Sequence, residues 1–456
     1  MSNAFFSDLL TSITERGRTL LRLENAQIDP QTRVSDLVGL CEKLLSGRGE
    51  ASGTALAREV LDRYVQLDEL GRQKFFYLLA SDFGPDVARL GAALDVWSRE
   101  QSDIAATDLH YASEPRRQEL LRRLNRAPGG TAALVDMREH LLELRKDNPE
   151  FKAIDRDLIH LLTSWFNRGF LVLRRINWET PANVLEKIIR YEAVHAIHDW
   201  DDLRRRIEPI DRRCYAFFHP AMLDEPLIFV EVALTAEIPG AIQPLLASER
   251  EIVPLSKART AVFYSISNCQ QGLNGISFGN FLIKQVVEEL RRELPKLETF
   301  VTLSPVPGFM RWLASKGKTL VGADDLPVLE SLDDPDWPQD KPFAQRAKAL
   351  LEPLAVQYFL EERSSNGRAL DSVARFHLGN GARLERIDWL GDTSRKGMLE
   401  SAGLMVNYLY DLDEIEKNHE AYANQGEIVA SPAVRKMLKS GTRGWRSTVT
   451  SVKAQT

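Results

Sequence analysis

Hydrophobic residues recur every three or four positions through roughly the first third of the chain, the spacing that places them on one face of an α-helix. Helix-start and turn residues such as Thr54, Ser113-Glu114-Pro115 and Pro128-Gly129-Gly130 separate the segments. No β-type alternation and no fixed repeat period interrupts this region, which predicts a packed helical bundle over residues 1–165. The predicted helices span residues 5–22, 33–46, 54–70, 72–80, 86–98, 114–126, 131–146 and 154–166.

The pattern changes near Trp165, where runs rich in β-branched and aromatic residues begin. Predicted helices over residues 179–195 and 344–363 lie among these runs, and Gly379-Asn380-Gly381 predicts a tight turn in a β-type stretch that contains His377. This mixture predicts an α/β domain with a mixed sheet over residues 166–456. The predicted strands span residues 169–176, 214–220, 225–235, 260–268, 297–304 and 403–412, and the acidic, proline-rich residues 324–345 form an excursion between elements.

The stretch from Thr260 to Phe309 has the order strand, glycine-rich turn, helix, strand. A glycine-rich turn that leads into a helix leaves backbone N–H groups free to face an anion, and the helix dipole favours negative charge there. The spacing of the glycines fits neither the P-loop nor the dinucleotide fingerprint, so the turn by itself is only a weak sign of a phosphate-bearing ligand. Ser304 ends the second strand, immediately before the rigid turn Pro305-Val306-Pro307-Gly308.

Composition narrows the partners and the compartment. A formal net charge of −6 argues against nucleic acid as the main partner. No apolar run approaches the roughly 18–20 residues that cross a membrane, and the first residues lack the pattern of a signal peptide. Three scattered cysteines imply neither a disulfide framework nor a zinc site. We therefore expect a cytoplasmic protein that binds neither membranes nor nucleic acids.

Few residues suggest chemistry by themselves. His195 and His198 have the spacing of two metal ligands on a helix face, but no third ligand is evident and Asp199-Trp200-Asp201-Asp202 resembles a helix end, so no metal site is predicted. His219 and His377 are open to either a structural or a functional interpretation. The candidate hydroxyls are Ser265, Ser267 and Ser304, and no standard hydrolase motif accompanies them.

Long blocks of the second domain resemble malonyl-CoA decarboxylases. The blocks extend from about Arg190 to Tyr410 and include YSISNCQQGLNGISFGNFLIKQVVEEL, VTLSPVPGFMRWL, VARFHLGNGARLERIDWL and SAGLMVNYLY. The resemblance implies an N-terminal helical bundle, for support and oligomerisation, followed by a catalytic domain with the acyl-CoA N-acyltransferase (GNAT) fold. It also implies malonyl-CoA as substrate and acetyl-CoA as product, with no metal or organic cofactor beyond the CoA of the substrate itself, and a homodimer or homotetramer.

The resemblance assigns roles to particular residues. Residues 260–268 and 297–304 would be neighbouring parallel strands that separate to admit the pantetheine arm of CoA. Ser304, which opens the Ser-Pro-x-Pro-Gly motif, and His377, in the Phe-His-Leu motif, would be catalytic, and Tyr410 would lie near the substrate carboxylate or else be a core aromatic. Some relatives carry an acidic residue at the position of Ser277, so no role for such a carboxylate carries over. The turn facing the CoA phosphates would comprise Asn274, Gly275, Ile276, Ser277, Phe278, Gly279 and Asn280.

Three functions remain open from the sequence. In a decarboxylase, Ser304 would hydrogen-bond the malonyl group, and His377, with an unperturbed pKa of about 6.5, would protonate C2 of the enolate. An acyltransferase on the same fold would also need an amine acceptor and a base. A non-catalytic acyl-CoA-binding protein would need the CoA site but neither Ser304 nor His377.

Overall fold

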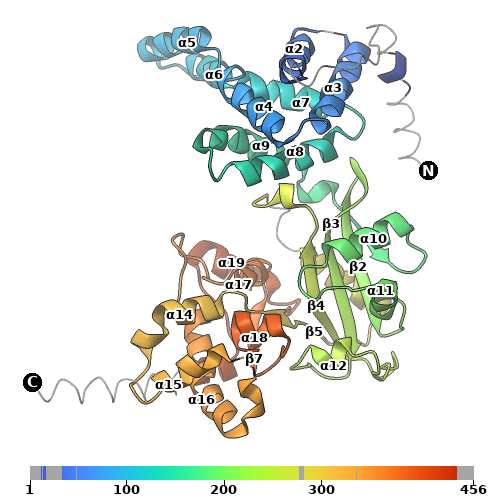
Figure 1. Ribbon diagram of the computed structural model, residues 1–456, viewed down its shortest axis with the longest axis vertical. Coiled ribbons are helices and arrows are strands. Elements are labelled where there is room, and N and C mark those ends of the chain that lie inside the picture. The colour runs from blue at the N-terminus through green and yellow to red at the C-terminus, as the bar shows by residue number, and fades with distance from the viewer. Residues whose placement is uncertain are drawn as a thin grey trace, which may run out of the picture. The chain divides into compact units, whose positions relative to one another are not determined.

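The computed structural model describes residues 12, 14–16, 33–47, 49–276, 282–334 and 336–438 (Figure 1). The chain divides into two compact units, which are described separately. The first comprises residues 1–172, 218–227 and 270–278, and the second comprises residues 173–217, 228–269 and 279–456. Within the described residues, no helix is long and apolar enough to cross a membrane.

The first unit is helical, as predicted. Its elements are α2 (Arg33–Ser46), α3 (Glu50–Val65), α4 (Glu69–Ser81), α5 (Val87–Glu100), α6 (Asp103–Ser113), α7 (Arg116–Leu124), α8 (Gly130–Leu144), η1 (Pro149–Phe151), α9 (Lys152–Trp165), η2 (Arg168–Phe170) and η3 (Gln271–Leu273). The predicted helix over residues 5–22 lies almost entirely outside the described residues. Helix α6 was not predicted, because only two small residues of α6, Ala105 and Ala112, are buried and the hydrophobic period is faint.

The core of the first unit contains aromatic rings and buried ion pairs. Phe75, Phe76 and Phe151 are fully buried, and Phe76 contacts Phe151 with ring centroids 5.7 Å apart. Arg138 of α8 pairs with Asp155 of α9 at 2.9 Å and also donates to the carbonyl of Gly272 at 2.6 Å. The glycine-rich turn is therefore anchored on α8.

The second unit contains a mixed sheet, as predicted. Its strands are β1 (Val172–Ile176), β2 (Arg212–His219), β3 (Met222–Thr235), β4 (Thr260–Asn268), β5 (Thr299–Thr302), β6 (Ser304–Pro305), β7 (Arg383–Asp388) and β8 (Met405–Leu409). The order is β1-β2-β3-β4-β5-β8-β6, with β7 also paired to β8. The predicted hairpin of residues 214–220 and 225–235 is present as β2 and β3, whose tip, residues 218–227, belongs to the first unit.

Helices flank this sheet. Figure 1 shows α10 and α11 beside the strands and the group from α14 to α19 on the other side. The helical elements of this unit are α10 (Ala182–Tyr191), α11 (Trp200–Ile207), α12 (Gln243–Leu246), α13 (Leu282–Glu293), α14 (Phe309–Leu320), α15 (Leu326–Glu330), η4 (Ser331–Asp333), η5 (Trp337–Gln339), α16 (Lys341–Leu360), α17 (Ser372–Gly379), α18 (Arg395–Ser401) and α19 (Ile415–Gln425). The predicted helices near residues 179–195 and 344–363 are α10 and α16.

Strands β4 and β5 form the expected parallel pair and then part. Their register runs from Thr260 opposite Thr299 to Phe263 opposite Thr302, and the last bond joins the Leu303 amide to the Phe263 carbonyl at 3.0 Å. Beyond this point β4 continues to Asn268 on β3, whereas β6 pairs with β8. Among the described residues, no strand pairs with the far half of β4 on that side. This separation of two parallel neighbours is the arrangement expected of a GNAT-like sheet.

Two local predictions are wrong. The stretch that contains His377 is helix α17 and not a strand, because the Asp371 carboxylate accepts from the amides of Val373 and Ala374 and starts a helix there. The segment after Asp199 begins a helix, α11, since the Asp199 side chain accepts from the Asp202 amide. His195 consequently lies in the loop between α10 and α11, not on a helix face with His198.

Candidate active site

Ser304 is held at the end of the parallel pair, where β6 joins β8. Its backbone lies opposite Val406, and its side chain is buried at 4% exposure. Thr302 lies two residues earlier, so its side chain faces the same side of the strand, and the Ser304 hydroxyl donates to Thr302 Oγ1 at 2.9 Å. Thr302 Oγ1 also accepts from the amide of Tyr408 at 3.1 Å. Ser304 is thus fixed by two strands.

His377 lies near the C-terminal end of α17 and reaches the same point. Its Nε2 atom is 3.1 Å from Ser304 Oγ, and its Nδ1 atom is 2.8 Å from the Tyr410 hydroxyl. Tyr410 follows β8 directly, and its amide donates to the carbonyl of Phe300 on β5 at 2.8 Å. The structure therefore brings together all three side chains for which the sequence suggested roles at the reacting end of the substrate.

Tyr408 stacks on the imidazole. The ring centroids of Tyr408 and His377 are 4.6 Å apart with an interplanar angle of 24°, whereas Tyr410 meets His377 edge-on at 6.1 Å. His377, Tyr408 and Tyr410 are all at most 3% exposed. This packing holds the plane of the imidazole and leaves it dry.

Burial determines the charge of these groups. It lowers the pKa of His377 to about 3 and raises the pKa of Tyr410 well above its ordinary value. His377 is therefore neutral, and Tyr410 keeps its proton, near pH 7. The expectation of an unperturbed imidazole pKa is wrong, because the sequence does not reveal that the ring is enclosed.

The comparisons with known proteins show the family of this chain. Residues 169–448 match the model of the malonyl-CoA decarboxylase C-terminal domain, and residues 83–166 match that of the N-terminal domain. The chain belongs to the malonyl-CoA decarboxylase family. The family predicted from the sequence is confirmed, and with it the enzyme class, the carboxy-lyases.

Individual members of the malonyl-CoA decarboxylase family are similar to this chain along most of their length. The mitochondrial malonyl-CoA decarboxylase of Anser anser anser is 38% identical over 411 residues, which are 82% of this chain and 81% of that protein. That of Rattus norvegicus is 36% identical over 437 residues, 88% of this chain and 85% of that one. The crystal structures of the malonyl-CoA decarboxylases of Rhodopseudomonas palustris and Agrobacterium vitis are 59% and 56% identical, with TM-scores of 0.86 and 0.84. Each of these two matches covers 88% of this chain and 99% of the chain in the crystal structure.

The glycine-rich turn is only partly described. Asn274, Gly275 and Ile276 belong to the first unit, whereas Ser277, Phe278, Gly279 and Asn280 lie outside the described residues. Ile276 packs in the hydrophobic core of the first unit, and Asn274 Nδ2 donates to Gln271 Oε1 at 2.7 Å. Gly275 has φ +80°, a conformation that favours glycine. The role of this turn in binding CoA phosphates stays a prediction.

Packing explains why residue 272 is a glycine. A Cβ at this position would collide with the carbonyl group of Val135 on α8. Its absence allows the backbone of the turn to lie against α8, where Arg138 binds the Gly272 carbonyl. This glycine therefore serves helix contact and not an anion.

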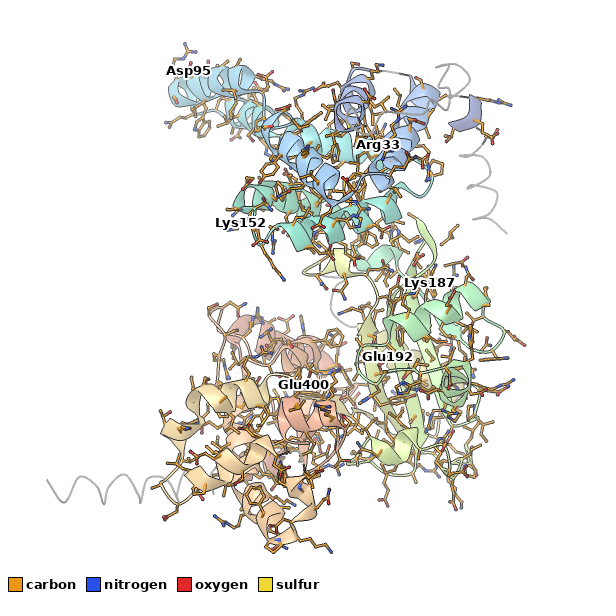
Figure 2. All side chains as sticks on the ribbon, in the orientation of Figure 1. Arg33, Asp95, Lys152, Lys187, Glu192 and Glu400 are labelled. Atoms are coloured by element: carbon orange, nitrogen blue, oxygen red, sulfur yellow. The ribbon has the colours of Figure 1, made fainter. Side chains whose placement is uncertain are left out.

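Ser265, Ser267 and His219 have structural partners. Ser265 and Ser267 donate to the buried carboxylate of Glu192, which follows α10 (Figure 2), at 2.7 and 3.1 Å. His219 is bonded to the Trp165 carbonyl at 3.0 Å and accepts from the Ala221 amide at 3.1 Å. Burial lowers the pKa of His195 to about 4. No group of three or more possible metal ligands occurs among the residues that the structure describes.

Sequence reasoning missed Thr302 as a partner of Ser304, and it did not predict that Tyr408 contacts His377. The alternation of side chains along a strand could have indicated Thr302, since it shares a face with Ser304. Tyr408 shares a face with Tyr410 in the same way. No local signal indicates that both tyrosines would meet His377, because α17 and β8 come together only in the folded domain.

Proposed function

We propose that this chain converts malonyl-CoA to acetyl-CoA and CO2, with Ser304 hydrogen-bonding the malonyl group and His377 donating the proton to C2. The observation that carries this proposal is the hydrogen-bonded series Tyr410–His377–Ser304–Thr302, which is buried in a chain of the malonyl-CoA decarboxylase family. Four side chains from separate elements meet there, each within hydrogen-bonding distance of the next.

We assign one order of protons to these neutral groups, the order that lets His377 donate a proton. Tyr410 keeps its O–H and can donate it to Nδ1 of His377. The single proton of the neutral imidazole is then on Nε2, which faces Ser304 Oγ. The Ser304 O–H points to Thr302 Oγ1 and turns to the malonyl group when substrate enters. In this arrangement the Nε2–H of the ring faces Ser304, the residue proposed to bind the malonyl group.

The reaction needs charge stabilisation and one proton. Cleavage of the bond between C2 and the carboxylate releases CO2 and leaves its electron pair in the enolate of acetyl-CoA. Ser304 fixes the malonyl group so that this bond overlaps the carbonyl π system, and hydrogen bonds preorganised in a dry site stabilise the developing charge. The enolate then takes the Nε2 proton of His377 on C2, and solvent returns a proton to the site after product leaves.

A neutral imidazole is acidic enough for this step. The enolate of a thioester is a much stronger base than an imidazolate, so the transfer from N–H to carbon is downhill. Enzymes of other families also use a neutral histidine, with its pKa depressed, as the hydrogen-bond donor to an enolate. The same low pKa speaks against an acyltransferase, because a ring whose conjugate acid has a pKa of about 3 is a poor base for an amine.

Purified protein incubated with malonyl-CoA without added metal tests the function. Acetyl-CoA, followed by mass spectrometry, should accumulate with the wild type and persist in the presence of a chelator, which also tests the proposal that no metal or organic cofactor is used. Ser304→Ala and His377→Ala should lower kcat by about 10²- to 10⁴-fold while CoA still binds. His160→Ala, at an exposed position on α9, is the control and should match the wild type. Intact malonyl-CoA despite tight CoA binding would refute the decarboxylase and direct the search to amine acceptors.

We also propose that the chain self-associates as a homodimer or homotetramer and acts in the cytoplasm. Helix α5 has no buried residue, and Val87 and Leu94 on α5 and Ile104 on α6 are exposed apolar side chains. Light scattering of the purified protein tests the assembly, since a mass near 51.6 kDa would identify a monomer. Fractionation of the source cells tests the compartment.

A further inference from the structure

One carboxylate connects the segments that carry Ser304 and His377. Asp371 is 2% exposed, and its Oδ1 atom accepts from the amides of Val373 and Ala374, both at 2.9 Å, in the first turn of α17. Its Oδ2 atom accepts from the hydroxyl of Tyr358 on α16 at 3.2 Å. The turn that follows Ser304 also lies close to this carboxylate, at Gly308.

Gly308 ends the turn that Ser304 begins. It is the residue before α14, and the turn between it and Ser304 contains Pro305 and Pro307, whose rings restrict the backbone. A Cβ at Gly308 would collide with the Tyr358 hydroxyl and lie 3.5 Å from Asp371 Oδ2. The turn is therefore pressed against the same carboxylate that starts α17.

The connection extends to both reacting side chains. Ser304 is four residues before Gly308 along a stiff turn, and His377 lies on the short helix that Asp371 begins. A helix cap alone needs one carboxylate oxygen, and Oδ1 supplies it. The bond from Tyr358 is additional to the cap. Together with the close packing of Gly308 against Tyr358 and Asp371, it relates α16 and the Ser304 turn to α17.

We propose that Asp371 is a positioning residue that sets the 3.1 Å distance between Ser304 Oγ and His377 Nε2. The proposal rests on the decarboxylation function proposed above, because that distance matters only if both groups act on one substrate. A displacement of about 1 Å at a reacting group can cost about 10²-fold in rate. A loosened link between the turn and α17 therefore acts on kcat, whereas the CoA-binding residues are untouched.

The test compares three variants of the full chain. Asp371→Asn keeps one oxygen for the helix cap but replaces the second oxygen with a donor, which faces the donor hydroxyl of Tyr358. Tyr358→Phe removes one bond to Asp371 and leaves the cap intact. Asp340→Asn is the matched control, because Asp340 caps α16 in the same unit by accepting from the Phe343 amide at 3.1 Å and has no bond to the Ser304 turn or to α17 among the described contacts.

The readouts separate positioning from folding. We expect Asp371→Asn to lower kcat for malonyl-CoA about 10- to 100-fold with KM within about twofold, and Tyr358→Phe to lower kcat less. Asp340→Asn should keep the wild-type kcat, whatever its melting temperature. The ¹⁵N resonances of the His377 imidazole, identified by their loss in His377→Gln, should shift in Asp371→Asn but not in Asp340→Asn.

Several outcomes would overturn the proposal. Asp371→Asn with wild-type kcat and unchanged His377 resonances would do so, as would an equal loss of kcat in Asp340→Asn. If the wild type made no acetyl-CoA, the proposed function would fail and the resonances alone would decide. Shifted His377 signals would then support the positioning role of Asp371, and unchanged signals would refute it.

Discussion

The Nε2 atom of His377 and the hydroxyl oxygen of Ser304 lie 3.1 Å apart, although 73 positions separate them in the sequence. One side chain comes from the short helix α17 and the other from the strand β6, and Tyr410 fixes the far side of the ring. Both side chains are buried and neutral. Each has a second hydrogen-bond partner, Tyr410 for His377 and Thr302 for Ser304. Such a pair is suited to deliver one proton to a strong carbon base and poorly suited to activate a nucleophile, which favours the decarboxylation proposed here.

The first prediction concerns the pH dependence of kcat/KM. Because burial lowers the pKa of His377 to about 3, the ring does not titrate between pH 6 and 8, and kcat/KM should be flat in this range. An imidazolium acid with an ordinary pKa of about 6.5 would instead lose activity about tenfold per pH unit above that value. Initial rates at low malonyl-CoA concentration and constant ionic strength give the profile, and such a tenfold decline would show that His377 acts as the cation.

The second prediction concerns the hydroxyl of Tyr410. Tyr410→Phe leaves Nδ1 of a buried imidazole without its partner, which costs about 1–3 kcal/mol and so lowers kcat roughly 10- to 100-fold. Tyr215→Phe is the control and should keep the wild-type kcat. Tyr215 lies on β2, and this substitution removes a hydroxyl that is bonded to Glu293 at 3.3 Å. Steady-state kinetics also separates two roles. An increase in KM with kcat unchanged would contradict the support of His377 and indicate that Tyr410 binds the substrate carboxylate.

The sequence offered Ser304, His377 and Tyr410 as candidates because the blocks that contain them resemble those of the malonyl-CoA decarboxylases, and the structure brings these three side chains together. It assigned His377 to a strand for a physical reason: Val373, Phe376 and Leu378 favour strands locally, whereas the helix depends on the Asp371 cap and on packing. The low pKa of His377 also could not be predicted, since burial of the ring is a property of the folded domain. Local pattern shows which side chains are present but not their solvation.

Gly272 has a role that the local sequence pattern could not reveal. Glycines in a turn before a helix bind phosphate in several folds, and the predicted phosphate-facing turn, residues 274–280, begins two residues after Gly272. In the structure this residue lies against Val135, a contact from a distant helix that no local pattern reveals. Thr302 and Asp371 escaped notice for a related reason, since a threonine in a strand and an aspartate before a helix are common, and their partners are remote in the chain.

The third prediction concerns Gly308. Gly308→Ala places a methyl group where the Tyr358 hydroxyl lies, so the turn after Ser304 must shift, and kcat should fall at least tenfold. Gly322→Ala is the control, because nothing lies within 4 Å of a Cβ there, and it should keep the wild-type kcat and melting temperature. Kinetics and thermal unfolding of both variants check this. A wild-type kcat in Gly308→Ala would show that the turn tolerates displacement.

The fourth prediction links the neutral state of His377 to stability. The pKa of His377 is about 3 in the folded chain and about 6.5 in the unfolded chain, so between these values the unfolded chain binds more protons. The neutral ring therefore contributes to the free energy of unfolding. This contribution is complete above pH 6.5 and declines by about 1.4 kcal/mol for each pH unit as the pH falls toward 3. Glu231, whose pKa burial raises to about 8, acts in the opposite direction, because its contribution declines as the pH rises from about 4.5 to 8.

The comparison of wild type with His377→Gln removes the contribution of Glu231, which both chains share. The free energy of unfolding in urea should differ most between the two chains at pH 7, in favour of the wild type. This difference should shrink by about 1.4 kcal/mol per pH unit between pH 6 and pH 4, because only the wild type must keep an imidazole uncharged. A difference that stays constant over this range would mean that the ring is protonated in the folded chain, and the neutral donor in the proposed mechanism would then be wrong.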